Sequence, residues 1–314
     1  MFSYIPKQEH SPSTAKVWLL ALLCTVWLGT GLTGHDPWQP DDAYSFGLIY
    51  HILQSGDWLI PTLAGERHLE HPPLFYMTAA FFARLFSPLL DLHDGARLAS
   101  GFYTAFTLLF TGLAGRELFG SGRGWTAVII LIGCLGMLVR SHELITDLAL
   151  LTGCAMMLYG YALGRRHIFL SGVFIGSGVG IGFMSKGLIA PVLFVLISVV
   201  LLLFHTWRSR SFFTSLAVAL LFALPWLIVW PVLLYQHSPE LFMEWFWTHN
   251  VGRWLDYIQT GHFARPFYYL KMLPWFAWPA LPLAAWKVWE ERKRALHEAE
   301  FQLLLVSFFV MLLA

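Results

Sequence analysis

Acidic residues at two points in the chain have the type and spacing of groups that do chemistry. Asp41 and Asp42 follow the first apolar run, and Asp147 stands at the mouth of a later one. Carboxylates beside an apolar run are costly, and they hold a cation or act as a general base. The alternative is that all three are ordinary loop acids, solvated, ion-paired or capping the helices that follow them.

Basic and histidine side chains lie near other turns between apolar runs. Glu70 and His71 precede a Pro-Pro pair, which favours a helix start where a phosphate or a metal binds, or else an ordinary capped helix. Lys186 stands between two apolar segments with almost no loop around it. It requires a protein carboxylate or a lipid phosphate as its partner, unless the side chain snorkels to the interface.

A loop rich in aromatic residues, 237–266, contains a further group of candidates. His249, Asn250, His262 and Arg265 are interspersed with Trp and Tyr side chains in this loop. Aromatic residues mixed with Arg and His line sugar or lipid-phosphate sites. They also form interfacial belts at the membrane surface, and the loop alone does not choose between the two.

The elements that position these residues are apolar helices. The 314 residues are 57% hydrophobic and only 12% charged, and several apolar runs reach the length that crosses a bilayer. We expect an all-α fold, a polytopic transmembrane bundle of about nine spans. No basic arm or acidic tail is present, which argues against a nucleic-acid partner. The predicted spans are 17–34, 96–118, 124–140, 145–163, 168–184, 187–204, 212–236, 267–287 and 301–314.

Positive charge predicts the orientation of these spans, because cytoplasmic loops are enriched in Lys and Arg. The basic residues fall at alternate helix ends only if the short apolar segment 74–86 lies at the outer interface without crossing. The first run then acts as a retained signal anchor, with the N-terminus in the cytoplasm. The loop 35–95, the turns at 140–147 and 185–187, and the loop 237–266 face outward.

Read together, these segments resemble a known family. The order Pro-Asp-Asp from Pro40, Ser-Gly-Asp-Trp from Ser55 and Glu-His-Pro-Pro from Glu70 is similar to the first outer loop of membrane glycosyltransferases of the GT-C fold. The similarity is strongest to the branch that transfers 4-amino-4-deoxy-L-arabinose to lipid A, which is related to protein O-mannosyltransferases. It extends through Thr146-Asp147, the Lys186 turn and the stretch around His249, and it covers nearly the whole chain from Trp38 to Trp286. We therefore expect one GT-C-like domain over 1–314.

The resemblance implies transfer of a sugar from a polyprenyl-phosphate donor to a lipid or protein acceptor, in the bacterial inner membrane and on its outer face. By position, Asp41 and Asp147 match the catalytic acids, and Glu70 matches an acid near the donor phosphate or a divalent metal. The donor phosphate is expected at Lys186, Arg265 and His71. The residues expected to line the substrate are Asp42, His249, Asn250 and His262.

Two departures from the family pattern bear on the site. The family has Lys where this chain has His71, so the phosphate contact there is lost, weakened or pH-dependent. The usual Asp-Glu is Asp41-Asp42, with a shorter second side chain. The family also continues with further spans and a soluble domain, which this sequence does not contain.

On the basis of this resemblance, our hypothesis is an inverting displacement at the anomeric carbon. Asp41 deprotonates or orients the acceptor, while Lys186 and Arg265, with a metal at Glu70 if one binds, stabilise the departing phosphate. Two other functions stay open. One is a secondary transporter, although its ionisable groups usually interrupt helices near the membrane midplane. The other is a non-catalytic protein of the same fold that binds polyprenyl phosphate.

Overall fold

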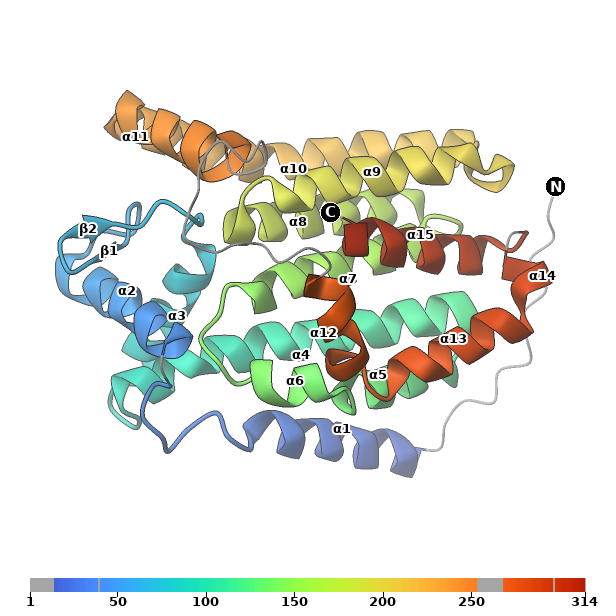
Figure 1. Cartoon of the computed structure of the whole chain (residues 1–314), viewed down its shortest axis with the longest axis horizontal. Helices are drawn as coiled ribbons and strands as arrows, with labels where there is room; N and C mark the ends of the chain where they lie inside the picture. Colours follow the sequence, from blue (N-terminus) through green and yellow to red (C-terminus); the bar gives the residue numbers. More distant parts are fainter. Residues whose placement is uncertain (1–13, 39, 253–267, 296, 314) are drawn as a thin grey trace.

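Helices make up almost all of the chain in the computed structural model, which describes residues 14–38, 40–252, 268–295 and 297–313 (Figure 1). This confirms the all-α prediction. A short 3₁₀ turn, η1 (His205–Trp207), follows α9, and a π-helix, η2 (Glu244–Gly252), follows α11. The α-helices are α1 (Thr14–Gly29), α2 (Asp41–Ser55), α3 (Leu74–Phe86), α4 (Leu92–Phe119), α5 (Arg123–Ile132), α6 (Leu135–Arg140), α7 (Asp147–Leu163), α8 (Ile168–Lys186), α9 (Ile189–Leu203), α10 (Arg210–His237), α11 (Pro239–Met243), α12 (Tyr268–Phe276), α13 (Ala280–Glu290), α14 (Arg292–Ala295) and α15 (Ala299–Leu313).

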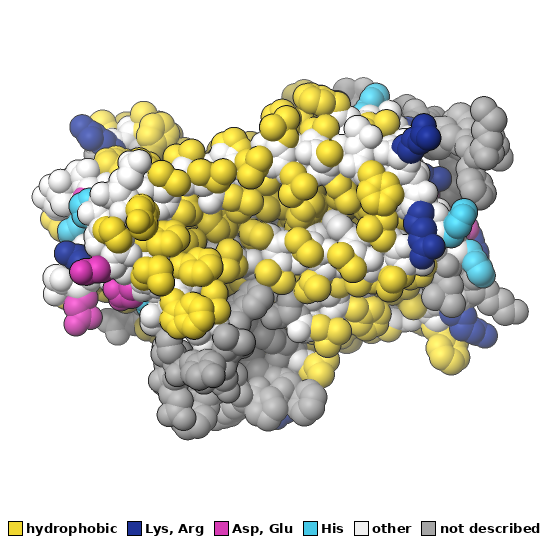
Figure 2. Space-filling view, turned by 90° about the horizontal axis from the view of Figure 1, so that it is seen from above, with side chains coloured by type: hydrophobic (Ala, Val, Ile, Leu, Met, Phe, Trp, Pro, Cys, Tyr) yellow, Lys and Arg dark blue, Asp and Glu magenta, His cyan; other side chains and the backbone are white. Residues whose placement is uncertain are grey.

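Charge gathers at the two ends of the helical bundle, and apolar surface covers its side. α2, α3 and a small β-hairpin form one end, which we call the hairpin end (Figure 1). The opposite end carries the α4–α5, α7–α8 and α9–α10 turns with their Arg residues, and we call it the basic end. Figure 2 shows a broad hydrophobic band between the two ends, with Asp and Glu side chains near the hairpin end. This distribution is that of a membrane-embedded bundle.

Three helices within the described ranges are long and apolar enough to cross a membrane: α4, α8 and α10. Six shorter apolar helices accompany them, namely α1, α3, α5, α7, α9 and α15. In α10 the exposed apolar side chains include Leu221, which is 63% accessible, as expected for a surface that faces lipid. The number of about nine spans stays a prediction.

Two of the predicted spans are broken in the structure. The run 124–140 divides into α5 and α6 at Gly133, and the run 267–287 divides into α12 and α13 just before Pro279. Glycine weakens a helix and proline cannot donate to the helical ladder, so both are natural places for a break. The two breaks lie together, because the Leu135 amide donates a 3.1 Å hydrogen bond to the Trp278 carbonyl.

Glycines allow α7, α8 and α10 to pack closely, as small residues do in membrane bundles. Gly153 of α7 lies against Gly178 of α8, where an added methyl group on either would come 2.5 or 2.6 Å from the other's carbonyl oxygen. On another face of α8, a side chain at Gly176 would collide with the backbone of α10. Because α7 begins where α8 ends, this packing brings Asp147 and Lys186 to the same place.

The β-hairpin joins α2 to α3, and the sequence patterns did not predict it. β1 (Thr62–Leu63) pairs antiparallel with β2 (Glu66–Arg67), and Thr62 lies opposite Arg67. The two turn residues, Ala64 and Gly65, both have positive φ, as two-residue hairpin turns require. The strand β2 leads directly into the segment 68–71, so the hairpin determines where that segment lies.

Candidate active site

A cavity of about 430 Å³ opens at the hairpin end of the bundle, with polar and charged side chains around it. Its lining comes from α2, from the segment before α3, from the α6–α7 loop, from the end of α8 and from η2. Segments far apart in the sequence therefore meet here. The predicted site residues that line the cavity are Asp41, Glu70, His71, Asp147, Lys186 and His249.

Asp41 lies at the first position of α2, with its carboxylate accessible from the cavity. The side chain is 59% exposed, and it accepts a 3.2 Å hydrogen bond from the Arg140 guanidinium. Arg140 also binds Glu143 over 2.8 Å. Burial raises the pKa of Glu143, and the nearby Arg140 opposes that rise. Arg140 therefore orients an exposed acid and a partly buried one at the same time.

Asp147 and Lys186 form the second ion pair of the cavity, with Nζ 3.0 Å from a carboxylate oxygen. Asp147 begins α7 and Lys186 ends α8, so each charge stands at the helix end whose dipole favours it. Lys186 is only 18% exposed, whereas Asp147 is 60% exposed. The carboxylate that Lys186 requires is thus Asp147, whereas Arg140 pairs with Asp41 and Glu143.

Aromatic and histidine side chains form one wall of the cavity. The Tyr44 hydroxyl lies 2.9 Å from Nδ1 of the buried His68, and the Tyr76 hydroxyl lies 3.5 Å from Nε2. The ring of His71 meets His68 edge-on, with centroids 5.9 Å apart. Burial lowers the pKa of His68 to about 4, against the opposing effect of Glu70. His68 is therefore neutral at physiological pH and acts as a rigid, uncharged part of the wall.

Asp42 lies outside the cavity, within a buried ion network. Its carboxylate accepts hydrogen bonds from Arg97 at 3.1 and 3.3 Å and from the Leu144 amide at 2.6 Å. Arg97 is completely buried and donates also to Asp94 over 2.8 Å and to the His35 carbonyl over 2.7 Å. We call Asp42, Asp94 and Arg97 the buried triad. It ties the start of α2 to α4 and to the loop before α7.

Asn250 also lies outside the cavity, and it holds η2 against the turn between α8 and α9. Its side-chain oxygen accepts from the Leu188 amide at 3.1 Å, and its amide nitrogen donates to the Trp245 carbonyl at 2.9 Å. Gly187 has a φ of +66°, and any side chain there would collide with Asn250. Asn250 therefore supports the turn that carries Lys186. The other two predicted residues, His262 and Arg265, lie outside the described residues.

A metal at Glu70 was one expectation from the family resemblance, and a metal needs several ligands close together. Within the described ranges, one group of His, Cys, Asp or Glu side chains has three ligand atoms within 4.8 Å of one another: Asp91, His93 and Asp94. Asp94 already belongs to the buried triad, and Glu70 is not in the group. A metal at Glu70 therefore stays an expectation from the family resemblance.

Several residues of this region were missed by sequence reasoning. Arg97 lies inside the predicted span 96–118, where an arginine is costly unless it is paired, and that cost was a usable signal. His68, Tyr44 and Tyr76 carried no comparable signal, because their meeting depends on the β-hairpin and on the packing of α2 against α3.

Fold and site together define a class: an α-helical membrane protein with an ionic cavity at one end of its bundle. The family model of dolichyl-phosphate-mannose-protein mannosyltransferases matches residues 70–230, about half of the chain. The chain belongs to this family, which confirms the resemblance of its motifs to GT-C glycosyltransferases.

Similar proteins come from the branch that the sequence motifs indicated. The undecaprenyl phosphate-alpha-4-amino-4-deoxy-L-arabinose arabinosyl transferase of Pseudomonas aeruginosa (strain UCBPP-PA14) is 28% identical over 90% of this chain and 52% of its own length. The enzyme of the same name from Edwardsiella ictaluri (strain 93-146) is 30% identical over 91% of this chain and 52% of its own. The chain thus spans about half the length of the curated relatives it matches.

Solved structures show the same fold. The crystal structure of ArnT from Cupriavidus metallidurans bound to undecaprenyl phosphate superposes with a TM-score of 0.78 at 18% identity, over 96% of this chain and 55% of that one. Its apo state gives a TM-score of 0.75 at 19% identity, again over 96% of this chain.

Proposed function

We propose that this chain carries the active site of a membrane glycosyltransferase that moves a sugar from a polyprenyl-phosphate donor to a lipid acceptor. The observation that carries the proposal is the cavity itself, where an exposed acid and a nearly buried lysine face one space. Such a reaction needs a group that receives or orients the acceptor and a cation for the leaving phosphate. The names of the relatives support the donor and the reaction.

The reaction is an inverting displacement at the anomeric carbon. The acceptor oxygen forms a bond to that carbon as the bond from carbon to the phosphate oxygen breaks, and polyprenyl phosphate leaves. Where the acceptor is a hydroxyl, Asp41 takes its proton; where it is an ionised phosphate, no base is needed and Asp41 orients it. Arg140 keeps the Asp41 carboxylate in place for either role.

Lys186 is the candidate for binding the leaving phosphate. A lysine ammonium group has three N–H donors, so Lys186 can bind a phosphate oxygen while it retains Asp147. Because Lys186 is largely screened from solvent, its charge acts more strongly than an exposed one. His71, His249 and Glu70 line the same cavity, which supports a role for them in binding the donor.

The membrane orientation is part of the proposal. About nine crossings, with broken helices at α5–α6 and α12–α13, would place the N-terminus in the cytoplasm and the cavity on the outer face of the bacterial inner membrane. The gathering of Arg and Lys at the basic end supports this orientation, since cytoplasmic ends carry the positive charge. The hydrophobic band between the ends supports the crossing (Figure 2).

The test is the release of polyprenyl phosphate by the full-length gene product, purified in detergent and supplied with a polyprenyl-phosphate-sugar donor and a glycolipid acceptor. We expect Asp41→Asn to slow release roughly 100- to 10,000-fold while the donor still binds. Asp36→Asn is the matched control, because Asp36 is an exposed acid of the same loop that does not line the cavity. Equal release by wild type and Asp41→Asn would remove Asp41 from the mechanism. Donor binding without release in the wild type would favour a binding protein.

A further inference from the structure

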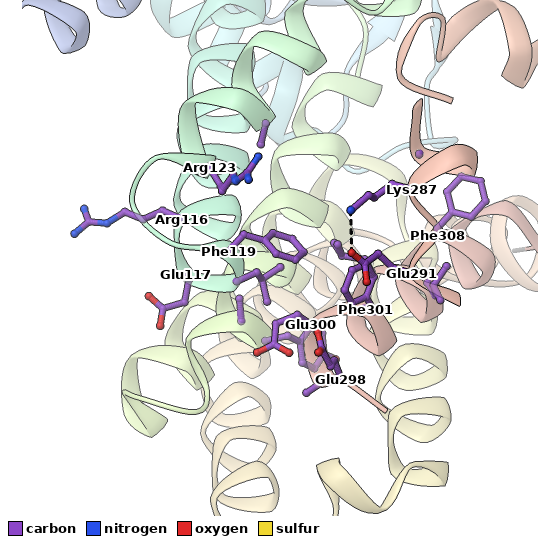
Figure 3. Close-up of a pocket in the computed structure, with 18 of the residues that line it drawn as sticks. Arg116, Glu117, Phe119, Arg123, Lys287, Glu291, Glu298, Glu300, Phe301 and Phe308 are labelled. Atoms are coloured by element: carbon purple, nitrogen blue, oxygen red, sulfur yellow. Dashed lines mark hydrogen bonds and ion pairs between the residues drawn. The ribbon is translucent and has the colours of Figure 1, made fainter. Parts of the chain in front are cut away.

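A second cavity, of about 2120 Å³, lies at the basic end, opposite the candidate active site. It is bounded by the end of α4, by α5, by the α7–α8 turn and by the α13–α15 segment. Phe119 of α4 and Phe301 of α15 meet in its lining, with ring centroids 6.0 Å apart (Figure 3). The cavity therefore joins an early part of the chain to a late one.

Positive charge is in surplus around this cavity. Its lining contains seven Arg and Lys residues and four Glu, and each of the four carboxylates already has a basic partner. Glu291, for example, binds Lys287 at 2.9 Å (Figure 3) and Arg294 at 3.0 Å. The other acid–base pairs are Glu117–Arg166, Glu298–Arg294 and Glu300–Arg165. The surplus of three positive charges thus has no carboxylate in the lining left to neutralise it.

Arg123 and Arg292 are the basic residues of the lining that best fit an anion. Within the described part of the chain, neither makes an ion pair with a carboxylate, and Arg292 instead stacks over Trp289 at 4.9 Å. Arg116 has no such pair there either, but Figure 3 shows its side chain extending away from the others. Arg123 and Arg292 are therefore the basic residues of this lining whose charge an anion would neutralise.

The body of the cavity is apolar. None of the described residues of α13 is buried, although its side chains at Leu281, Ala284 and Val288 line the cavity. Ile130 of α5 and Phe308 of α15 also line it. α13 therefore leaves an apolar slot beside its neighbours. The bilayer core contains no water, so hydrocarbon chains are the groups available to fill this slot.

We propose that this cavity binds an anionic phospholipid of the bilayer. The acyl chains lie along α13, and the phosphate of the headgroup neutralises the surplus charge of Arg123 and Arg292. Basic pockets between membrane helices bind anionic headgroups in this way. The proposal requires membrane embedding but not glycosyl transfer, so each can fail without the other.

The experiment measures lipid binding by native mass spectrometry on the delipidated full-length protein, titrated with dioleoyl phosphatidylglycerol or with dioleoyl phosphatidylethanolamine. We expect tighter binding of phosphatidylglycerol, and a double variant, Arg123→Gln with Arg292→Gln, that weakens it roughly 10- to 30-fold. Arg210→Gln is the matched control, because Arg210 is an exposed arginine of the same end that does not line the cavity.

A second variant tests the slot without changing any charge. Ala284→Trp places a large side chain where the acyl chain would lie, and we expect it to weaken binding of both lipids by a similar factor. Equal affinity for the two lipids in the wild type would overturn the proposal, as would an equal loss in Arg210→Gln. No bound phospholipid at all, the result expected if another part of the protein fills the cavity, would overturn it too.

Discussion

Asp41 and Asp42 are neighbours in the sequence, yet they occupy opposite environments. The Asp41 carboxylate is 59% exposed at the cavity, whereas that of Asp42 is 1% exposed and accepts hydrogen bonds from a buried arginine and from backbone amides. Successive residues of a helix point about 100° apart, so one turn of α2 presents one acid to the cavity and the other to the core. The Asp41 carboxylate is therefore suited to a chemical role, and the Asp42 carboxylate is suited to stabilising the fold.

The same contrast separates the two kinds of ion pair at the hairpin end. In the buried triad the guanidinium of Arg97 has no exposure, and its partners are fixed by further hydrogen bonds. In the cavity, Lys186 pairs with Asp147 and Arg140 pairs with Asp41, and both of these carboxylates remain largely exposed. A buried network resists exchange of partners, while a cation paired with an exposed carboxylate can bind a second anion at little cost. The position of an ion pair in the fold, more than the residue types in it, therefore decides whether the pair stabilises the fold or is available for chemistry.

The largest expected effect comes from breaking the buried triad. Arg97→Ala leaves two buried carboxylates without their cation, and removal of one partner of a buried pair costs about 3–5 kcal/mol. We expect a large fall in melting temperature and a loss of monodisperse protein in detergent, as followed by fluorescence-detected size-exclusion chromatography. Arg84→Ala, an exposed arginine of α3 at the same end, is the control and should melt like the wild type.

A triple variant sharpens this test. Arg97→Met combined with Asp42→Asn and Asp94→Asn removes all three charges together, so no buried charge is left unpaired. We expect it to recover part of the stability that Arg97→Ala loses. If Arg97→Ala melts like the wild type, the triad does not hold the hairpin end together, and the contrast between Asp41 and Asp42 fails.

The next effect concerns activity alone. Lys186→Met keeps the apolar stem of the side chain and removes the charge that faces the cavity. We expect release of polyprenyl phosphate to slow roughly 100- to 1,000-fold, with a melting temperature close to that of the wild type. Lys271→Met, an exposed lysine of α12 outside the cavity, should have no effect on either measurement. A variant that loses stability in proportion to activity would place Lys186 with the supporting residues.

The sequence predicted those features of the site that depend on local patterns of residues. Apolar runs indicated the helices, and the costs of Asp147 and Lys186 beside such runs marked them as residues that need partners. The pairing of those two followed only from the glycine contacts between α7 and α8. The different environments of Asp41 and Asp42 depend on Arg97, 55 residues away in the chain, and no local pattern contains that contact.

The smallest effect at neutral pH comes from His68, the neutral member of the cavity wall. Burial lowers its pKa from the usual 6.5 to about 4, so between these values the unfolded chain binds a proton that the folded chain does not. Stability therefore falls as the pH drops from 6.5 to 4, by about 3 kcal/mol at most, and is unaffected above pH 7. We expect His68→Gln, which keeps a hydrogen-bonding group near Tyr44, to lessen this fall.

The measurement is the difference in melting temperature between variant and wild type across pH 4–8, because that difference cancels the titration of the carboxylates. His237→Gln, an exposed histidine, is the control. A constant difference at all pH values would mean that His68 titrates alike in the folded and unfolded chain, and the wall of the cavity would then be as open to water as Asp41 is.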